Sequence, residues 1–190
     1  MAVKRSQLLA KVGFELMDKK RNILVSEMMS MIDDARGLQK EIDEVFKKAY
    51  LSLQRANVTM GIVTDEAECV EIDNSLDFKL KSVMGVEIPV ISHNTDKPKI
   101  AYGFLQTNSM IDDAFVNFTE AKNLSIKLAQ IETSIYRLAI AIKKTQKRAN
   151  ALKNIIIPDN EKTIKFITEA LEEKEREEFT RLKVIKKMKE

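Results

Sequence analysis

Apolar residues recur along the first part of the chain at alternating steps of four and three. The series there is Leu24, Met28, Met31, Ala35, Leu38, Ile42, Val45 and Ala49. Such a heptad repeat keeps one stripe of a helix against a partner helix. Because no proline interrupts residues 1–57, the pattern predicts one long N-terminal helix over that range.

A longer repeat of the same kind runs through the last part of the chain. It consists of Ala121, Leu124, Leu128, Ile131, Ile135, Leu138, Ile142, Thr145, Ala149, Leu152 and Ile156. The residues from Ser109 to Asp112 resemble a capping box, which places the start of this helix there, within a C-terminal segment of residues 107–190. A proline, Pro158, predicts a kink or a local break in the helix, and the phase of the repeat changes across it before the apolar residues resume at Ile164.

Two apolar stripes in one chain are most simply buried when the helices fold back on each other. The sequence therefore predicts an intramolecular antiparallel two-helix coiled coil, a rod rather than a globule. Matching the two stripes end to end places Leu24 near Ile156 and Leu38 near Leu138. Paired residue numbers then add up to roughly 175–180.

The middle segment, residues 58–106, has a different pattern. It holds 3 of the 5 glycines and 2 of the 3 prolines. Apolar residues alternate on both sides of Gly85, which predicts a small β-hairpin, and residues 69–73 predict another short strand. The expected fold is thus dominated by α-helix, with a hairpin-containing middle segment that packs on the coiled coil or on another subunit.

Composition supports long exposed helices. Charged residues make up 32% of the chain, aromatic residues 6%, and tryptophan is absent. A net charge of +3 does not call for a polyanionic partner, and the single cysteine, Cys69, excludes an internal disulfide framework. The single cysteine is typical of a cytoplasmic, reducing location. Because no apolar run is long enough to span a membrane, we expect no direct membrane insertion.

Candidate chemistry is sparse. The lone histidine, His93, has no second metal ligand near it, and Cys69 has no histidine to activate it. The run from Glu172 to Glu178 offers helical ion pairs rather than an acid–base site. The acidic stretch from Asp65 to Asp77 fits an exposed or partner-facing surface, with a cation site as the alternative. We therefore expect no catalytic residue, no cofactor, no metal and no nucleic-acid partner; the basic residues near both ends suit a polar protein channel.

Three regions of the sequence resemble the D subunit of V-type and A-type rotary ATPases. The longest lies near the C-terminus and comprises Lys147–Leu152, Ile157–Pro158, Thr163–Ile167 and Leu171–Lys183. The other two are Asp18–Val25 in the first helix and Val83–Pro89 with Ala101–Gly103 in the middle segment. The resemblance covers nearly the whole chain.

This resemblance implies a non-catalytic rotor shaft that couples ATP hydrolysis or synthesis in an A3B3 hexamer to H⁺ or Na⁺ transport. It implies a hexamer-contacting tip that includes Lys4, Lys11, Phe179, Leu182 and Ile185. It also implies that the middle of the chain, with Val83, Met84, Val86 and Ile88, docks two partners of the central stalk. They are the F subunit on its side and the C subunit, also named d, above the membrane ring. A coiled-coil scaffold unrelated to rotation is the alternative.

Overall fold

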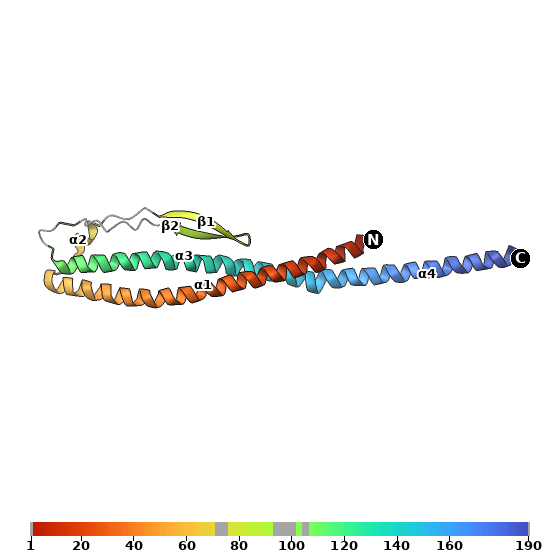
Figure 1. The fold of residues 1–190 in the computed structure, drawn as a ribbon, viewed down its shortest axis with the longest axis horizontal. Helices are drawn as coiled ribbons and strands as arrows, with labels where there is room; N and C mark the ends of the chain where they lie inside the picture. The colour runs from red at the N-terminus through yellow and green to blue at the C-terminus, as the bar shows by residue number, and fades with distance from the viewer. Residues whose placement is uncertain (1, 71–75, 93–101, 104–106, 190) are drawn as a thin grey trace. The chain divides into compact units, whose positions relative to one another are not determined.

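The computed structural model describes residues 2–70, 76–92, 102–103 and 107–189 (Figure 1). Its elements are α1 (Ala2–Met60), α2 (Thr64–Glu68), β1 (Asp77–Val83), β2 (Val86–Ser92), α3 (Ser109–Ala151), a π-helical turn (Leu152–Ile156) and α4 (Ile157–Lys189). Long helices and one small hairpin confirm the predicted fold class. Contacts divide the chain into two units, one of Leu24–Ala141 and one of Met1–Ile23 with Ile142–Glu190.

Within each unit the N-terminal helix runs antiparallel to the C-terminal one. In the first unit Ser52 lies opposite Asn117 and Thr59 opposite Asn108. In the second unit Gln7 bonds to Glu161 and Arg21 to Gln146. The residue numbers of these pairs add up to 167–169, so the predicted register is wrong.

The register error has a simple origin: both stripes continue past the ends that the sequence pattern showed. The α1 stripe continues to Ala56, which is buried, and the α3 stripe begins already at Ile111. Helix α1 ends at Met60 because Gly61 adopts a left-handed φ of 86° and its N–H bonds to the Asn57 carbonyl at 3.0 Å. This is the usual αL end of a helix, in which glycine carries no Cβ penalty.

Stripe residues make up most of the core between the two helices, and polar residues interrupt the buried row at Asn117, Ser134 and Thr145. Leu24, Ile42, Leu124 and Leu138 are buried, and the other predicted stripe residues up to Leu152 are buried or half-buried. Asn117 is also buried, and its Nδ2 donates to Ser52 Oγ at 3.0 Å. A buried amide with one matching partner favours a single register over slipped alternatives.

A π-helical turn just before Pro158 is the local break expected there, and it explains the change of phase. The Ile157 N–H bonds to the Leu152 carbonyl, five residues back, so the turn absorbs one extra residue. The half-buried stripe therefore steps from Leu152 to Ile157 and on to Ile164, whereas Ile156, predicted as a stripe residue, is 42% exposed. The turn keeps the start of α4 facing α1 despite the altered spacing.

The hairpin is confirmed and lies against α3. Its two-residue turn is made by Met84 and Gly85, with φ of 50° and 76°, the pattern of a type I′ turn. Ile91 N–H donates to Gln130 Oε1 at 2.9 Å, and Arg137 Nη1 donates to the Glu87 carbonyl at 3.1 Å. Strand β2 thus lies between β1 and α3 (Figure 1).

Two further predictions need correction. Asn108, not Ser109, caps α3, because its Oδ1 accepts the Met110 N–H at 2.9 Å. Cys69 and Val70 form a turn after α2 rather than a strand, and residues 71–73 lie outside the described residues. No helix in the described part of the chain is long and apolar enough to cross a membrane.

Candidate partner-binding surfaces

Most of the residues that could carry chemistry do not come together in an enclosed site within the described part of the chain. Among the described residues, no three His, Cys, Asp or Glu side chains gather where they could hold a metal ion. Cys69 is exposed, and His93 lies outside the described residues. The predicted ion pairs of the acidic run form along α4, Glu172 with Arg176 at 3.7 Å and Glu177 with Arg181 at 3.8 Å.

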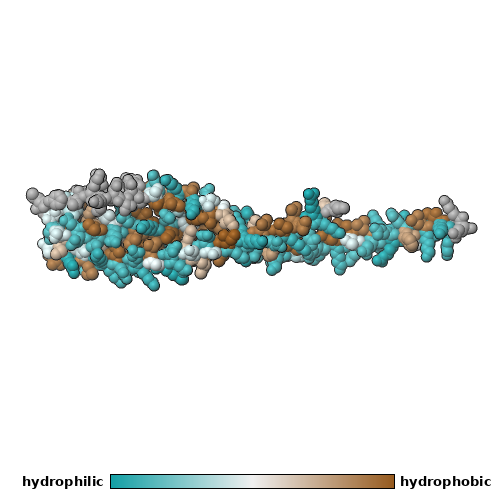
Figure 2. Space-filling view, in the orientation of Figure 1, coloured by the Kyte–Doolittle hydropathy of each residue, from teal (hydrophilic) through white to brown (hydrophobic). Residues whose placement is uncertain are grey.

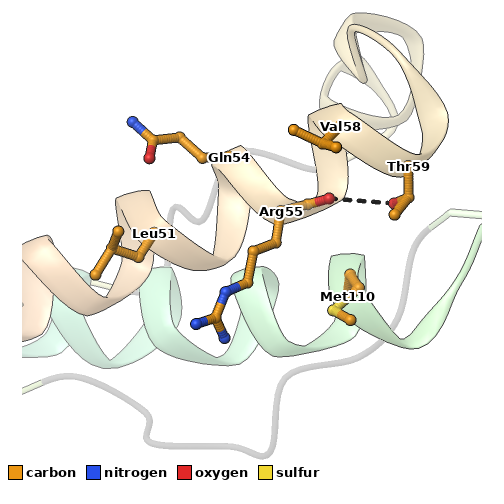
Figure 3. A pocket seen from close by; sticks show the side chains of 6 residues that line it. All are labelled: Leu51, Gln54, Arg55, Val58, Thr59 and Met110. Carbon is orange, nitrogen blue, oxygen red and sulfur yellow. Dashed lines mark hydrogen bonds between the residues drawn. The ribbon is translucent and has the colours of Figure 1, made fainter.

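One shallow depression lies between the end of α1 and the start of α3 (Figure 3). Its volume is about 310 Å³, and its lining residues are Leu51, Gln54, Arg55, Val58, Thr59 and Met110. Thr59 Oγ1 both donates to the Arg55 carbonyl and accepts from Asn108 Nδ2, which ties the two helices together beside it. The lining is mostly apolar and open, which suits a protein side chain better than a small polar substrate.

Beside this depression, Tyr102 anchors the chain that leads into α3. Its ring is 6% exposed, belongs to a core cluster with Ala56 and Ile111, and meets Phe115 edge to face. Its hydroxyl donates to Asp112 Oδ1 at 2.5 Å. Burial comes first and the Asp112 hydrogen bond and charge second in raising the pKa of the Tyr102 hydroxyl above its ordinary value. The phenol stays neutral and keeps donating at every physiological pH.

The four predicted docking residues of the hairpin do not share one environment. Ile88 is only 4% exposed, and Val83 and Val86, on the same face, are half-buried. Met84 is exposed at the turn in a left-handed conformation that costs a non-glycine residue about 1–2 kcal/mol. Such strain is typical of positions kept for function, so Met84 remains a docking candidate.

The opposite face of the hairpin is the more exposed apolar surface, and sequence reasoning missed it. Phe78 and Leu80 are 68% and 61% exposed. They pair across the strands with Ile91 and Pro89, which places all four side chains on one face. The alternation that predicted the strands could not show which of their faces is turned toward α3.

The predicted tip residues lie in the unit that contains both termini. Lys11 pairs with Glu161 at 3.2 Å, while Phe179, Leu182 and Ile185 belong to a stretch of α4 that is exposed throughout. Gln7 and Lys11 both bond to Glu161, so the start of α1 lies beside the first part of α4 and not beside Phe179. The basic N-terminal residues and the apolar C-terminal ones are therefore not brought together.

Two other exposed apolar groups were not predicted. One is a stripe on the outer side of α1 formed by Leu8, Leu9, Val12 and Leu16. The other is the pair Tyr136 and Ile140, one helical turn apart on the side of α3 away from its stripe. Figure 2 shows such hydrophobic patches along otherwise hydrophilic helices. Where exposed apolar residues form a contiguous patch, they are candidates for protein–protein contacts.

Comparison with known proteins agrees with these features. The family model that describes the D subunit of ATP synthase matches residues 1–187. The V-type ATP synthase D subunit of Thermotoga neapolitana is 41% identical over 188 residues, which cover 98% of this chain and 93% of that protein. The A-type ATP synthase D subunit of Pyrococcus horikoshii is 38% identical over 191 residues, covering 98% of this chain and 89% of that protein. The chain belongs to the family of ATP synthase D subunits.

Proposed function

We propose that this chain is the central rotor shaft of a rotary V/A-type ATPase. In this proposal it carries no catalytic residue and binds no cofactor. It transmits torque between an A3B3 hexamer, where ATP is hydrolysed or made, and a membrane ring that transports H⁺ or Na⁺. The names of its relatives, the D subunits of V-type and A-type ATP synthases, support this assembly. The chain would then be cytoplasmic and peripheral to the membrane through its partners.

The observation that carries the proposal is the last part of α4, which packs against no other helix within the described residues. From residue 165 to residue 188 every residue of α4 is exposed, whereas Ile164 is still half-buried. At 1.5 Å per residue this stretch is about 35 Å long. It nevertheless carries exposed apolar residues, among them Phe179, which is 70% exposed.

A lone helix with exposed apolar residues is marginal in water and needs another surface. The inside of a hexameric ring would supply one on all sides. The ring would contact α4 at Phe179, Leu182 and Ile185. Lys4 and Lys11 would lie near the entrance of the ring. The other unit, with its hairpin and the depression beside Met110, would hold the F and C subunits.

Shortening α4 tests the proposal. Removing residues 172–190 should leave binding to the F subunit intact, because that surface belongs to the other unit. ATP-driven ion transport should fall more than ATP hydrolysis, because a shortened shaft slips before nucleotide turnover stops. The measurement is both activities on the same reconstituted complex.

A second variant removes the apolar side chains but keeps the length of the helix, so it separates these two effects. The triple change Phe179→Ala, Leu182→Ala and Ile185→Ala keeps a strong helix former at each position and should lower transport per ATP. The control, Glu175→Ala with Glu178→Ala, changes exposed charges on the same stretch and should have little effect. Transport per ATP that stays unchanged in both the truncation and the triple variant refutes this role for α4.

A further inference from the structure

The two outer edges of the hairpin are not equivalent. A two-residue turn makes Val83 and Val86 the first hydrogen-bonded pair, so Ser82–Glu87, Leu80–Pro89 and Phe78–Ile91 are non-hydrogen-bonded pairs. The backbone groups of those residues point away from the ladder. On β2 they point toward α3, and on β1 they point outward.

The outer edge of β2 is turned toward α3 and is bonded to it at two backbone groups. The Ile91 N–H is bonded to Gln130, the Glu87 carbonyl is bonded to Arg137, and Pro89 has no N–H to offer. Because α3 lies along this edge, it leaves no room for a further strand on this side. These contacts also hold the hairpin in place on α3.

The outer edge of β1 is unused among the described residues. The N–H and C=O groups of Phe78, Leu80 and Ser82 point away from β2, and no hydrogen bond to them is formed within the described part of the chain. Every residue of β1 except Val83 is exposed. A row of unpaired backbone groups on a fixed strand is a template for one more strand.

The side chains of β1 alternate in chemistry as well as in direction. Phe78 and Leu80 lie on the outer face, and Lys79 and Lys81 lie on the other face, exposed. Neither lysine forms an ion pair with any residue that the structure describes. A strand added beside β1 would therefore meet apolar side chains on one face and positive charges on the other.

We propose that β1 binds an extended segment of another polypeptide in which apolar and acidic residues alternate. Backbone hydrogen bonds to Phe78, Leu80 and Ser82 hold the segment, its apolar side chains cover Phe78 and Leu80, and its carboxylates pair with Lys79 and Lys81. A second copy of this chain is the wrong occupant. Antiparallel pairing of two β1 strands centred on Leu80 sets Lys79 against Lys81, and like charges directly opposite are destabilising.

The inference does not depend on the rotor assignment, because it can be tested on the full chain alone. The probe is a short peptide in which glutamate and valine alternate. The comparison peptides have lysine in place of glutamate, or the same composition with the two residue types in separate blocks. Amide exchange measured by NMR on the labelled chain reports which backbone groups become bonded.

The alternating acidic peptide should slow exchange at Phe78, Leu80 and Ser82, and both comparison peptides should bind more weakly. Ser82→Pro removes one outward N–H, as Pro89 already does on β2, without touching the ladder. It should weaken binding at least about tenfold, equivalent to about 1.4 kcal/mol, while Ser82→Ala should not. Because Ser82→Pro could disturb the hairpin itself, Lys79→Glu with Lys81→Glu provides an independent variant that should reverse the preference toward the lysine peptide.

Four results would overturn the proposal. The first three are equal binding of the acidic and lysine peptides, protection at other residues without protection of the β1 edge, and self-association through β1. Binding that persists unchanged in Ser82→Pro, with the hairpin amide signals intact, would overturn it as well.

Discussion

Replacing Tyr102 with phenylalanine removes one hydroxyl from the anchor beside α3 and leaves the ring in place. The ring keeps its edge-to-face contact with Phe115 and its place against Ala56 and Ile111. What is lost is the 2.5 Å hydrogen bond to the Asp112 carboxylate. Hydrogen bonds to charged groups contribute about 1.5–3 kcal/mol, so Tyr102→Phe should lower the free energy of unfolding by about that amount.

The chain supplies its own control. Tyr136 is 68% exposed, and no hydrogen bond of its hydroxyl is formed within the described residues. Tyr136→Phe should therefore change the free energy of unfolding by less than about 0.5 kcal/mol. The assay is urea denaturation of both variants and the unchanged chain, followed by circular dichroism. Equal effects of the two substitutions would refute the anchoring role of the Tyr102 hydroxyl.

The pH dependence gives a second measure of the same contact. Because folding raises the pKa of Tyr102 above the unfolded value of about 10, the stabilisation is fully present below that pH. It is lost as the pH rises toward the folded pKa. The difference between the unchanged chain and Tyr102→Phe should be constant from pH 7 to about pH 9 and shrink above about pH 10. A difference that grows above pH 10 would contradict the assigned cause.

Two further predictions concern the coiled coil and the hairpin. With Cys69 replaced by serine, cysteines at Ser52 and Asn117 should form a disulfide within one chain under oxidation, detected on a non-reducing gel. Cysteines at Leu38 and Leu138 should not, because the observed register separates them by about eight residues, or about 12 Å along the helix; the opposite result would restore the register expected from the sequence. Replacing residues 77–92 by a short flexible linker should leave the helical circular dichroism signal nearly unchanged, because the apolar stripes lie outside the hairpin, and a large loss would show that the hairpin is part of the core.

The helices were predictable because their signal is local. The heptad stripe needs only sequence spacing, and the ion pair of Glu172 with Arg176 needs only a separation of four residues. The hairpin was predictable for the same reason, since alternation on both sides of Gly85 is a short-range pattern. The register was not, because it depends on where each stripe ends, and the pattern did not show that Ala56 and Ile111 belong to the core.

Other features could not be predicted from residue spacing because they depend on contacts between parts of the chain that are far apart in sequence. The π-helical turn left a signal, the jump from Leu152 to Ile157, but the jump alone does not distinguish an absorbed residue from a rotated helix. The buried face of the hairpin is set by Gln130 and Arg137 of α3, far from it in sequence. The sequence could therefore predict the hairpin but not separate buried Ile88 from exposed Phe78 and Leu80.

If this chain is a rotor shaft, it turns inside its complex, and direct observation of rotation tests that claim. Cys69 is the only cysteine of the chain and is exposed, so a maleimide can attach a bead there without any substitution. The A3B3 hexamer is fixed to glass, and the bead is followed under the microscope as ATP is added. We expect rotation in one direction that stops when ATP is removed. A bead that stays fixed while the same complexes hydrolyse ATP would contradict the rotor assignment.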